Sequence, residues 1–199
     1  MHPNPLFRSE DRALLEGLLD EIGFGMVFLT TPDGPRVAHT PLLSMGDGRV
    51  RFHLSRGNAL TPHLAGARAL ITVNGPHGYV SPRWYAERDT VPTWDYVALE
   101  MEGTVEPMPG AELEAFLHAV IAKFEGRLGG EQWLASESSE ATWSRLFRGI
   151  GGFEMQVENW RPTLKLSQKK AGAEHAAIVA GISQAGNPEL ARWMRQVAA

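Results

Sequence analysis

Hydrophobic and polar residues change their period along the chain, and the first change marks a sheet. Between residues 26 and 55 they alternate with a period of two, which is typical of half-buried strands. Two turn signals, Pro32-Asp33-Gly34 and Gly46-Asp47-Gly48, divide this run into three strand-length pieces. The pattern therefore predicts an antiparallel meander over residues 26–55.

Other segments carry the helical period, with apolar residues three and four positions apart. The first predicted helix begins at Ser9, where acidic residues in the first turn complement the helix dipole, and ends at Gly23. The remaining predicted helices are 58–65, 110–128, 138–150 and two short helices after Lys170, separated by Gly186-Asn187-Pro188. Further strands are predicted at 67–73, 93–108 and 152–160.

The order of these elements indicates the fold class. Strands come first and helices follow in blocks, without the regular alternation that marks a parallel sheet. We therefore expect a mainly β member of the α+β class, with an antiparallel sheet closed or half closed into a barrel. The length suits one domain over residues 1–199, including a C-terminal helical extension at 170–199.

Composition excludes several classes of protein. The chain has no cysteine, which rules out disulfides and thiolate chemistry, and it has no apolar run approaching the roughly 18 residues of a membrane span. Its start lacks the pattern of a signal peptide, so we expect a cytoplasmic protein. A net charge of -4 disfavours direct DNA binding, and no helix pair resembles a helix-turn-helix with a basic recognition helix.

The most promising chemical motif is HLSRGN, residues 53–58, at the end of the third predicted strand. The hydroxyl of Ser55, the guanidinium of Arg56 and the amide of Asn58 lead into a predicted helix and would suit a phosphate group. The same residues would also make an ordinary turn with Asn58 as the helix cap. The basic run at 161–170 has two interpretations as well: a solvated loop, or a site for a small phosphate or carboxylate.

Two other places carry candidate groups. His39 and Thr40 precede Pro41, which cannot donate to a sheet ladder and so predicts an edge or a bulge where polar groups can meet a planar ligand. Residues 74–97 hold all three tyrosines and two of the six tryptophans, among prolines and glycines. This aromatic stretch predicts either a loop packed by its own side chains or a symmetric dimer interface. The seven histidines lack a compact spacing, so a metal site has little support.

Five segments together resemble a known family. They are HTPLL (39–43), HLSRGN (53–58), GPHGYVSPRWY (75–85), VPTWDYV (91–97) and KLSQ (165–168). Their order is similar to that in the PaiB-like FMN-binding negative transcriptional regulators, which are related to the pyridoxamine-phosphate-oxidase-like split barrels. The resemblance implies an antiparallel FMN-binding split β-barrel with flanking helices, and a homodimer with flavin sites at the subunit interface.

The resemblance also implies roles for individual residues. The FMN phosphate would be held by Ser55, Arg56 and Asn58, while His39 and Thr40 would lie on the strand that faces the isoalloxazine ring. Trp94 would belong to a stiff aromatic wall for the dimer and the flavin, and Lys165, Ser167 and Gln168 would lie near the same pocket. Relatives often continue KLSQ with Asn-Arg, whereas this chain has Lys169-Lys170.

Three functions follow from these expectations. The first is an FMN-binding homodimeric regulator of transcription, acting through a partner or a metabolite level instead of direct DNA contact. The second is an FMN-dependent oxidoreductase with a small substrate, and the third is a structural dimer that has lost flavin binding. The sequence does not identify a target gene or a substrate, and it leaves enzymatic turnover open.

Overall fold

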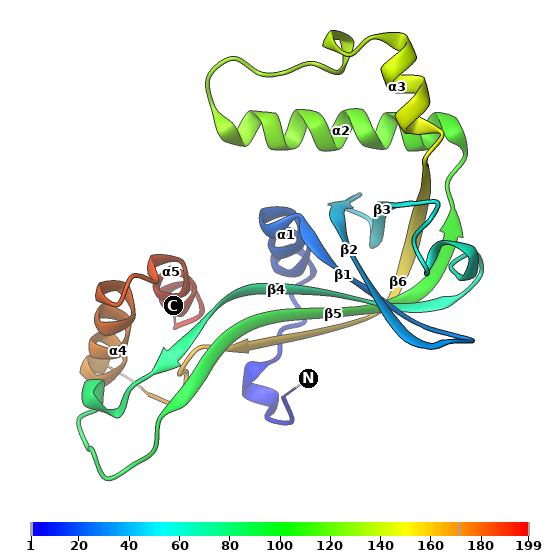
Figure 1. Cartoon of the computed structure of the whole chain (residues 1–199). Coiled ribbons are helices and arrows are strands. Elements are labelled where there is room, and N and C mark those ends of the chain that lie inside the picture. The colour runs from blue at the N-terminus through cyan, green and yellow to red at the C-terminus, as the bar shows by residue number, and fades with distance from the viewer. Residues whose placement is uncertain (1, 171, 199) are drawn as a thin grey trace. The chain divides into compact units, whose positions relative to one another are not determined.

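The computed structural model describes residues 2–170 and 172–198. Its strands are β1 (Phe24–Thr31), β2 (Gly34–Ser44), β3 (Arg49–Ser55), β4 (Arg68–Val80), β5 (Thr93–Pro107) and β6 (Ile150–Lys165). Its α-helices are α1 (Arg12–Ile22), α2 (Gly110–Leu128), α3 (Glu140–Phe147), α4 (Gly172–Gln184) and α5 (Pro188–Ala198). Short 3-10 turns lie at Pro5–Phe7, Thr61–His63, Pro82–Trp84 and Ala135–Glu137. Figure 1 shows these elements in chain order.

The strands close into a barrel in the order β1-β2-β3-β6-β5-β4. β1 pairs antiparallel with both β2 and β4, and β3 pairs antiparallel with β2 and β6. Inward-facing residues such as Val27, Phe52 and Ile71 are fully buried, because alternate residues of each strand point to the interior. The predicted fold class, a mainly β antiparallel barrel with flanking helices, is confirmed.

The chain divides into two compact units. The barrel unit contains Glu16–Val73 and Glu100–Trp160, and the terminal unit contains Met1–Leu15, Asn74–Leu99 and Arg161–Ala199. β4, β5 and β6 each contribute residues to both units. The single domain expected over residues 1–199 stays a prediction.

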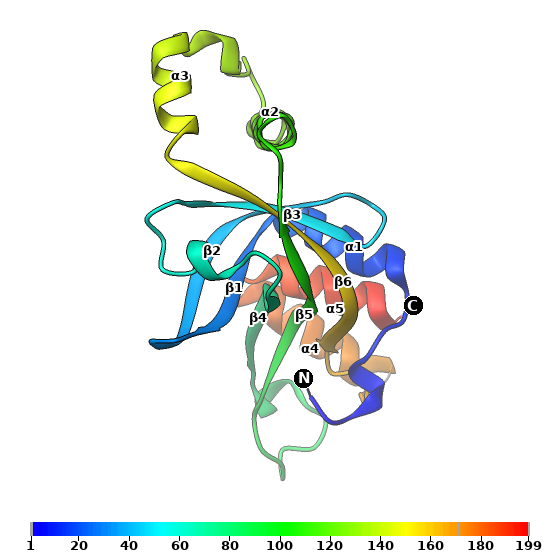
Figure 2. The same cartoon turned by 90° about the vertical axis from the view of Figure 1, so that its right-hand side faces the viewer.

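The helix predicted at 110–128 is confirmed as α2, with its bounds unchanged. Leu113 and Phe116 are buried and pack with Met108 and the partly buried Leu117 and Phe147. In Figure 2 the view runs along α2, and α3 leads back from this helical pair into β6. The pair thus covers part of the barrel unit with its apolar side.

Two local predictions were wrong. Residues 58–65 do not form an α-helix but a turn ending in a 3-10 segment, since Pro62 and Gly66 flank a stretch too short to sustain α-helical hydrogen bonds. α1 begins at Arg12 instead of Ser9, because Asp11 Oδ1 accepts the hydrogen bond from Leu14 N.

Pro41 was expected to mark an edge or a bulge. β2 as a whole lies between β1 and β3, but the register gives Pro41 itself a partner on the β1 side alone. Pro41 pairs with Phe24 at one end of the β1 ladder, and the next residue, Leu42, pairs with Phe52 of β3. The proline therefore lies where β2 changes partner. A missing donor costs little at that point, because the β3 ladder has not yet begun on the other side of the strand.

The terminal unit contains the aromatic stretch and the two C-terminal helices, whose prediction is confirmed. Their buried residues include Ile178, Ile182, Leu190, Trp193 and Met194. Gly181 of α4 lies directly against Trp84, since an added Cβ would be 2.3 Å from the indole ring. Across residues 2–170 and 172–198, no helix is both long enough and apolar enough to cross a membrane.

Candidate functional site

The HLSRGN motif forms a closed turn at the end of β3. Ser55 Oγ accepts a hydrogen bond from Gly57 N at 3.2 Å, and Asn58 Oδ1 accepts one from Leu60 N at 2.9 Å. Thr61 Oγ1 donates to the carbonyl oxygen of Ser55 at 2.7 Å. Asn58 therefore closes the turn with its side-chain oxygen, but the helix that it was expected to cap does not form.

Arg56 is fixed at its base but keeps an uncompensated charge. Its backbone N donates to Gly149 O at 2.9 Å, and its Nε donates to Arg148 O at 3.0 Å. The side chain is exposed, and neither Arg56 nor Arg148 has an acidic partner in the part of the chain that the structure describes. Two arginine side chains without an acidic partner among the described residues therefore come from adjacent segments, Arg56 from the turn after β3 and Arg148 from the junction of α3 and β6. Arg148 was not identified as a candidate from the sequence. The one available indication was a basic residue just before a predicted strand, β6.

A cavity of about 280 Å³ lies beside this turn, within the barrel unit. Arg56 and Thr61 line one side, and apolar residues including Met108, Leu113 and Phe147 line the other. β6 passes close to these residues at Gly152, where a Cβ would lie 2.8 Å from Leu113 and Met108. The cavity is therefore mainly apolar, with a guanidinium among its lining groups.

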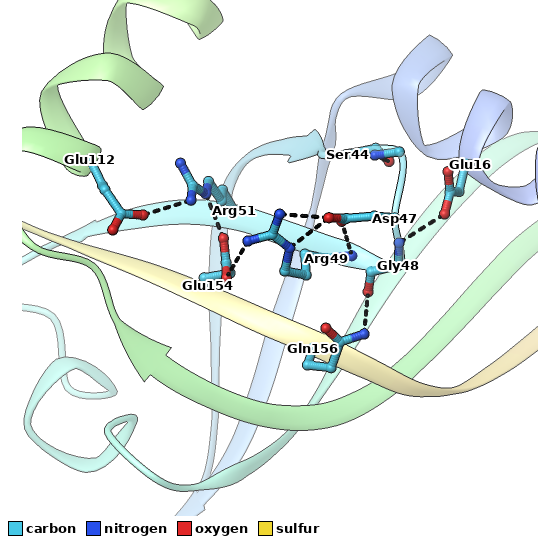
Figure 3. Close-up of polar contacts among 10 residues, drawn as sticks. Glu16, Ser44, Asp47, Gly48, Arg49, Arg51, Glu112, Glu154 and Gln156 are labelled. Atoms are coloured by element: carbon cyan, nitrogen blue, oxygen red, sulfur yellow. Dashed lines mark hydrogen bonds and ion pairs between the residues drawn. The ribbon is translucent and has the colours of Figure 1, made fainter.

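The outer polar face of β3 differs from this turn because its cations are neutralised (Figure 3). Arg51 contacts Glu154 and Glu112, each at 2.6 Å. Arg49 contacts Asp47 at 2.5 Å and Glu154 at 3.3 Å. The Arg49 guanidinium lowers the pKa of Asp47, and Asp47 raises the pKa of Arg49. Arg49 and Arg51 therefore do not offer free positive charge to a polyanion.

His39 and Thr40 point to opposite sides of β2, as neighbours on a strand must. His39 is exposed, whereas Thr40 is only 2% exposed and its Oγ1 donates to His53 O at 2.6 Å. His39 pairs with Met26, so these two residues share the outer face of the sheet. The hydroxyl of Thr40 is occupied inside the barrel unit, and a flavin contact by either residue stays a prediction.

The late KLSQ element forms a hydrogen-bonded network in the terminal unit, centred on Asp95. Lys165 Nζ donates to Thr93 Oγ1 at 2.5 Å, to Asp95 Oδ1 at 3.3 Å and to the carbonyl oxygen of Trp94. Ser167 Oγ donates to Asp95 Oδ2 at 2.5 Å. An ammonium group has three donors, so those of Lys165 are all used by the chain itself.

Gln168 is engaged in the same way. Its Oε1 accepts from Leu166 N at 2.8 Å, and its Nε2 donates to the carbonyl oxygen of Leu164. The side-chain groups of Lys165, Ser167 and Gln168 thus hold the local backbone in place. A contact between these residues and FMN stays a prediction.

Asp95 is the residue of this network that sequence reasoning missed. It is 0% exposed, and burial raises the pKa of its carboxyl group, against the opposing effects of Ser167 and Lys165. The available signal was a carboxylate at an inward position of a strand, in register with the buried Val97 and Leu99. Ser167 is also the one non-glycine residue with positive φ, 58°, among the described residues.

Trp94 lies on the outer face of β5, where 51% of it is exposed. Its Nε1 donates to His77 Nδ1 at 3.2 Å, the two rings stack at 5.9 Å, and Tyr79 meets Trp94 edge-on at 6.4 Å. The aromatic stretch therefore has two parts, one packed through Trp84 against α4 and one exposed around Trp94. The role of Trp94 toward a dimer or a flavin stays a prediction.

The predicted site residues fall into groups that belong to different units. The turn residues Ser55, Arg56 and Asn58 belong to the barrel unit, as do His39 and Thr40. Trp94, Lys165, Ser167 and Gln168 belong to the terminal unit. Within the barrel unit, Asn58 N donates a hydrogen bond to Ser55 O. Within the terminal unit, Lys165 and Ser167 both donate to Asp95.

Solved structures similar to this chain support the fold. The FAD- and heme-binding protein from Mycobacterium smegmatis has a TM-score of 0.61 at 22% sequence identity, covering 85% of this chain and 78% of that chain. The flavocytochrome Anf3 from Azotobacter vinelandii has a TM-score of 0.60 at 18% identity, covering 86% and 73% of the two chains. At these identities the likeness shows the fold alone.

Comparison of sequences identifies the family of the chain. The chain is 29% identical over 186 residues to the protease synthase and sporulation protein PAI 2 of Bacillus subtilis (strain 168), covering 92% of this chain and 89% of that protein. The family model described as "Putative FMN-binding domain" matches residues 1–159. These matches confirm the resemblance found in the five motifs, and FMN is the cofactor by which the family is described. The chain belongs to this family of FMN-binding domains.

Proposed function

We propose that this protein binds FMN and holds the phosphate group with the turn at Ser55–Asn58. The observation that carries the proposal is Arg56, whose charge lacks an acidic partner in the described chain although it lies beside a mainly apolar cavity. A guanidinium forms strong, charge-assisted hydrogen bonds with phosphate oxygens. Family membership supplies the identity of the ligand.

The residues around the turn fit such a cofactor. Arg56 and Arg148 would counter the charge of the phosphate, and the hydroxyl of Ser55 would add a donor. The cavity of about 280 Å³ lies just below the range of about 300–1,000 Å³ that encloses drug-sized ligands. A flavin nucleotide would therefore extend beyond it. When bound, FMN would supply the redox chemistry, while the chain binds and orients it.

A homodimer would complete the site. On the outer face of the barrel unit, Phe24 and Phe28 of β1 and Val37 of β2 are 51%, 36% and 42% exposed. The register pairs Phe28 with Val37 and Met26 with His39, so these side chains form one continuous, mainly apolar face. An isologous contact through this face would bury it and would place His39 at the interface. The exposed His39 is therefore a candidate flavin contact in the dimer.

We infer a regulatory role that depends on flavin and acts without direct DNA contact. The relative from Bacillus subtilis is named for protease synthesis and sporulation. The half-buried arginines of β3 are neutralised by Asp47, Glu154 and Glu112, which removes the clearest basic strand face for DNA. An FMN-dependent oxidoreductase is the alternative, and turnover of NAD(P)H with an electron acceptor by the purified protein would favour it.

The test is a titration of the purified protein with FMN, followed by absorbance, with the stoichiometry measured. We expect one FMN per chain, and we expect Arg56→Gln to weaken binding about ten- to a hundredfold, the value of a charge-assisted hydrogen bond. Arg36→Gln is the matched control, because Arg36 is an exposed arginine of the same unit whose guanidinium donates to the carbonyl oxygen of Pro35. If no FMN remains bound to the protein at saturating concentrations, the result contradicts the proposal and favours a structural dimer that has lost flavin binding.

Sedimentation of Phe28→Asp tests the dimer separately. A charge on the apolar face should convert the dimer into a monomer without unfolding it, because Phe28 is partly exposed within the chain. Wild-type protein that sediments as a monomer in the presence of FMN would overturn this part of the proposal.

A further inference from the structure

A second cavity, of about 230 Å³, lies wholly within the terminal unit. It is lined by His2, Asn4 and Phe7 from the N-terminal segment, Tyr85, Thr93 and Asp95 from the aromatic stretch, and the run from Ser167 to Lys170 with Lys165. These three segments are far apart in the sequence. The cavity is therefore formed by tertiary structure and not by one loop.

One wall of this cavity is the Asp95 network, which is already satisfied. The donors of Lys165 are used by Thr93, Trp94 and Asp95, and the hydroxyl of Ser167 is used by Asp95. Ser167 is held in the left-handed backbone region at φ 58°, which is unfavourable for a non-glycine residue and needs support from its surroundings. The network gives the cavity a wall of fixed shape.

Other lining residues of the cavity offer positive charge and an aromatic ring. Lys170 Nζ lies 4.4 Å from the centroid of the Tyr85 ring and pairs with Glu174 at 2.9 Å. Lys169 is exposed and has no acidic partner within residues 2–170 and 172–198. Lys165 is balanced by Asp95 and Lys170 by Glu174, so Lys169 leaves a net positive charge at the cavity. This local charge contrasts with the net charge of -4 of the whole chain.

Tyr85 and Phe7 supply the apolar part of the lining. Phe7 is 5% exposed and meets the ring of His2 edge-on at 4.7 Å. Burial raises the pKa of Tyr85, so its hydroxyl stays protonated near neutral pH and can donate a hydrogen bond. The cavity thus combines an aromatic surface, one phenolic donor and an uncompensated ammonium group.

We propose that this cavity binds a small aromatic anion, with its ring on the Tyr85 side and its carboxylate or phosphate at Lys169 and Lys170. The volume of about 230 Å³ suits a molecule smaller than a flavin nucleotide. The site uses none of the residues assigned to the FMN phosphate, so it does not depend on the proposed function. Its lining does include Lys165, Ser167 and Gln168, which were predicted from the sequence to lie near the flavin, and competition with FMN distinguishes the two assignments. In a regulator, such a site would let the level of a small metabolite act on the protein.

The probes are phenyl phosphate and benzoate, titrated into the purified full-length protein by calorimetry. We expect saturable binding of one probe per chain, weakened at least tenfold in Lys169→Gln/Lys170→Gln and weakened by added salt. Both lysines lie at the surface or close to it, so the variant should keep the fold of the wild type, which circular dichroism checks. Tyr85→Phe should keep most of the affinity because it retains the ring.

Arg56→Gln separates this site from the flavin site. We expect the affinity for phenyl phosphate to stay within about twofold in this variant, while FMN binding is weakened. Three outcomes would overturn the proposal: no saturable binding of either probe, unchanged affinity in Lys169→Gln/Lys170→Gln, or displacement of phenyl phosphate by FMN in direct competition. The last outcome would assign the cavity to the flavin and leave FMN binding itself intact.

Discussion

Arg56 and Lys165 make an instructive pair because the sequence presents both as cations beside a serine and an amide, whereas the structure uses them differently. The Nε of Arg56 donates to a backbone carbonyl, and its charge has no acidic partner in the described chain. The three donors of Lys165 meet Thr93, Trp94 and the buried Asp95. The first arrangement suits an external anion, and the second suits a structural support.

The difference shows that residue type and motif do not distinguish a ligand-binding group from a structural one. What distinguishes them is the number of donors left over once the chain has satisfied itself. Arg56 leaves guanidinium donors at the surface, and Lys165 leaves none. Most predictions below remove a partner from the Lys165 network or compare its role with that of Arg56, and one tests the packing of the aromatic stretch in the same unit.

Asp95→Ala should give the largest effect. Removing the buried carboxylate leaves the ammonium of Lys165 without its counter-ion, in a side chain that is only 16% exposed. Breaking a buried pair in this way costs about 3–5 kcal/mol of unfolding free energy, measured by urea denaturation. Asp47→Ala is the control, because it removes an exposed partner of Arg49, and its loss should be far smaller. Equal losses in the two variants would show that the Asp95 network is not a structural support.

Gly181→Ala should give the next largest effect. A methyl group at this position of α4 would lie 2.3 Å from the Trp84 ring, which would have to move and would disturb the packed part of the aromatic stretch. Overpacking of this kind costs about 1–3 kcal/mol. Gly17→Ala on α1 is the control, since nothing lies within 4 Å of the added methyl, and it should raise stability by about 0.5–1 kcal/mol. Thermal unfolding of the two variants should therefore shift in opposite directions.

The periodicity of the chain predicted most of the fold, because strand alternation and helical stripes follow from burial on one face. It predicted the meander of β1 to β3, the bounds of α2 and the two C-terminal helices. It failed at residues 58–65. There the hydrogen bond that Leu60 N donates to Asn58 Oδ1, together with the proline at position 62, favours a turn. A side chain that bonds to the backbone in this way competes with the hydrogen bonds of a helix, and the hydrophobic pattern does not reveal this competition.

The candidate site was less predictable, because its character depends on partners distant in the sequence. Arg56 meets Arg148 O across 92 residues, and Ser167 meets Asp95 across 72. The single sequence contains no signal for either pairing. It placed Ser55, Arg56 and Asn58 in one turn, but it did not show that Thr40 gives its hydroxyl to His53 O. The local turn was thus predictable from the sequence, whereas the hydrogen-bond partners of the individual side chains were not.

The pH dependence of stability offers a smaller effect from the same network. Burial raises the pKa of Asp95 above its ordinary value of 3.8, so the folded protein holds this proton more tightly than the unfolded chain does. The resulting stabilisation is complete below about pH 3.8 and is lost as the pH rises through the folded-state pKa. The stability advantage of wild type over Asp95→Asn should therefore shrink as the pH is raised from 4 in urea titrations. An advantage that grows with pH would mean that Lys165 outweighs burial.

Ser167→Ala should have the smallest effect on cofactor binding, although Ser167 is one of the residues predicted from the sequence to lie near the flavin. Its hydroxyl donates to Asp95 Oδ2 at 2.5 Å, so its removal costs stability, about 1 kcal/mol for one hydrogen bond. If the KLSQ element is a structural support, the affinity of the folded variant for FMN stays within about twofold of wild type, because no donor available to FMN is lost. Fluorescence titration with FMN, with Arg56→Gln measured alongside, provides the comparison. If Ser167→Ala weakens FMN binding as much as Arg56→Gln does, the KLSQ element contacts the cofactor, and the distinction between the two cations fails.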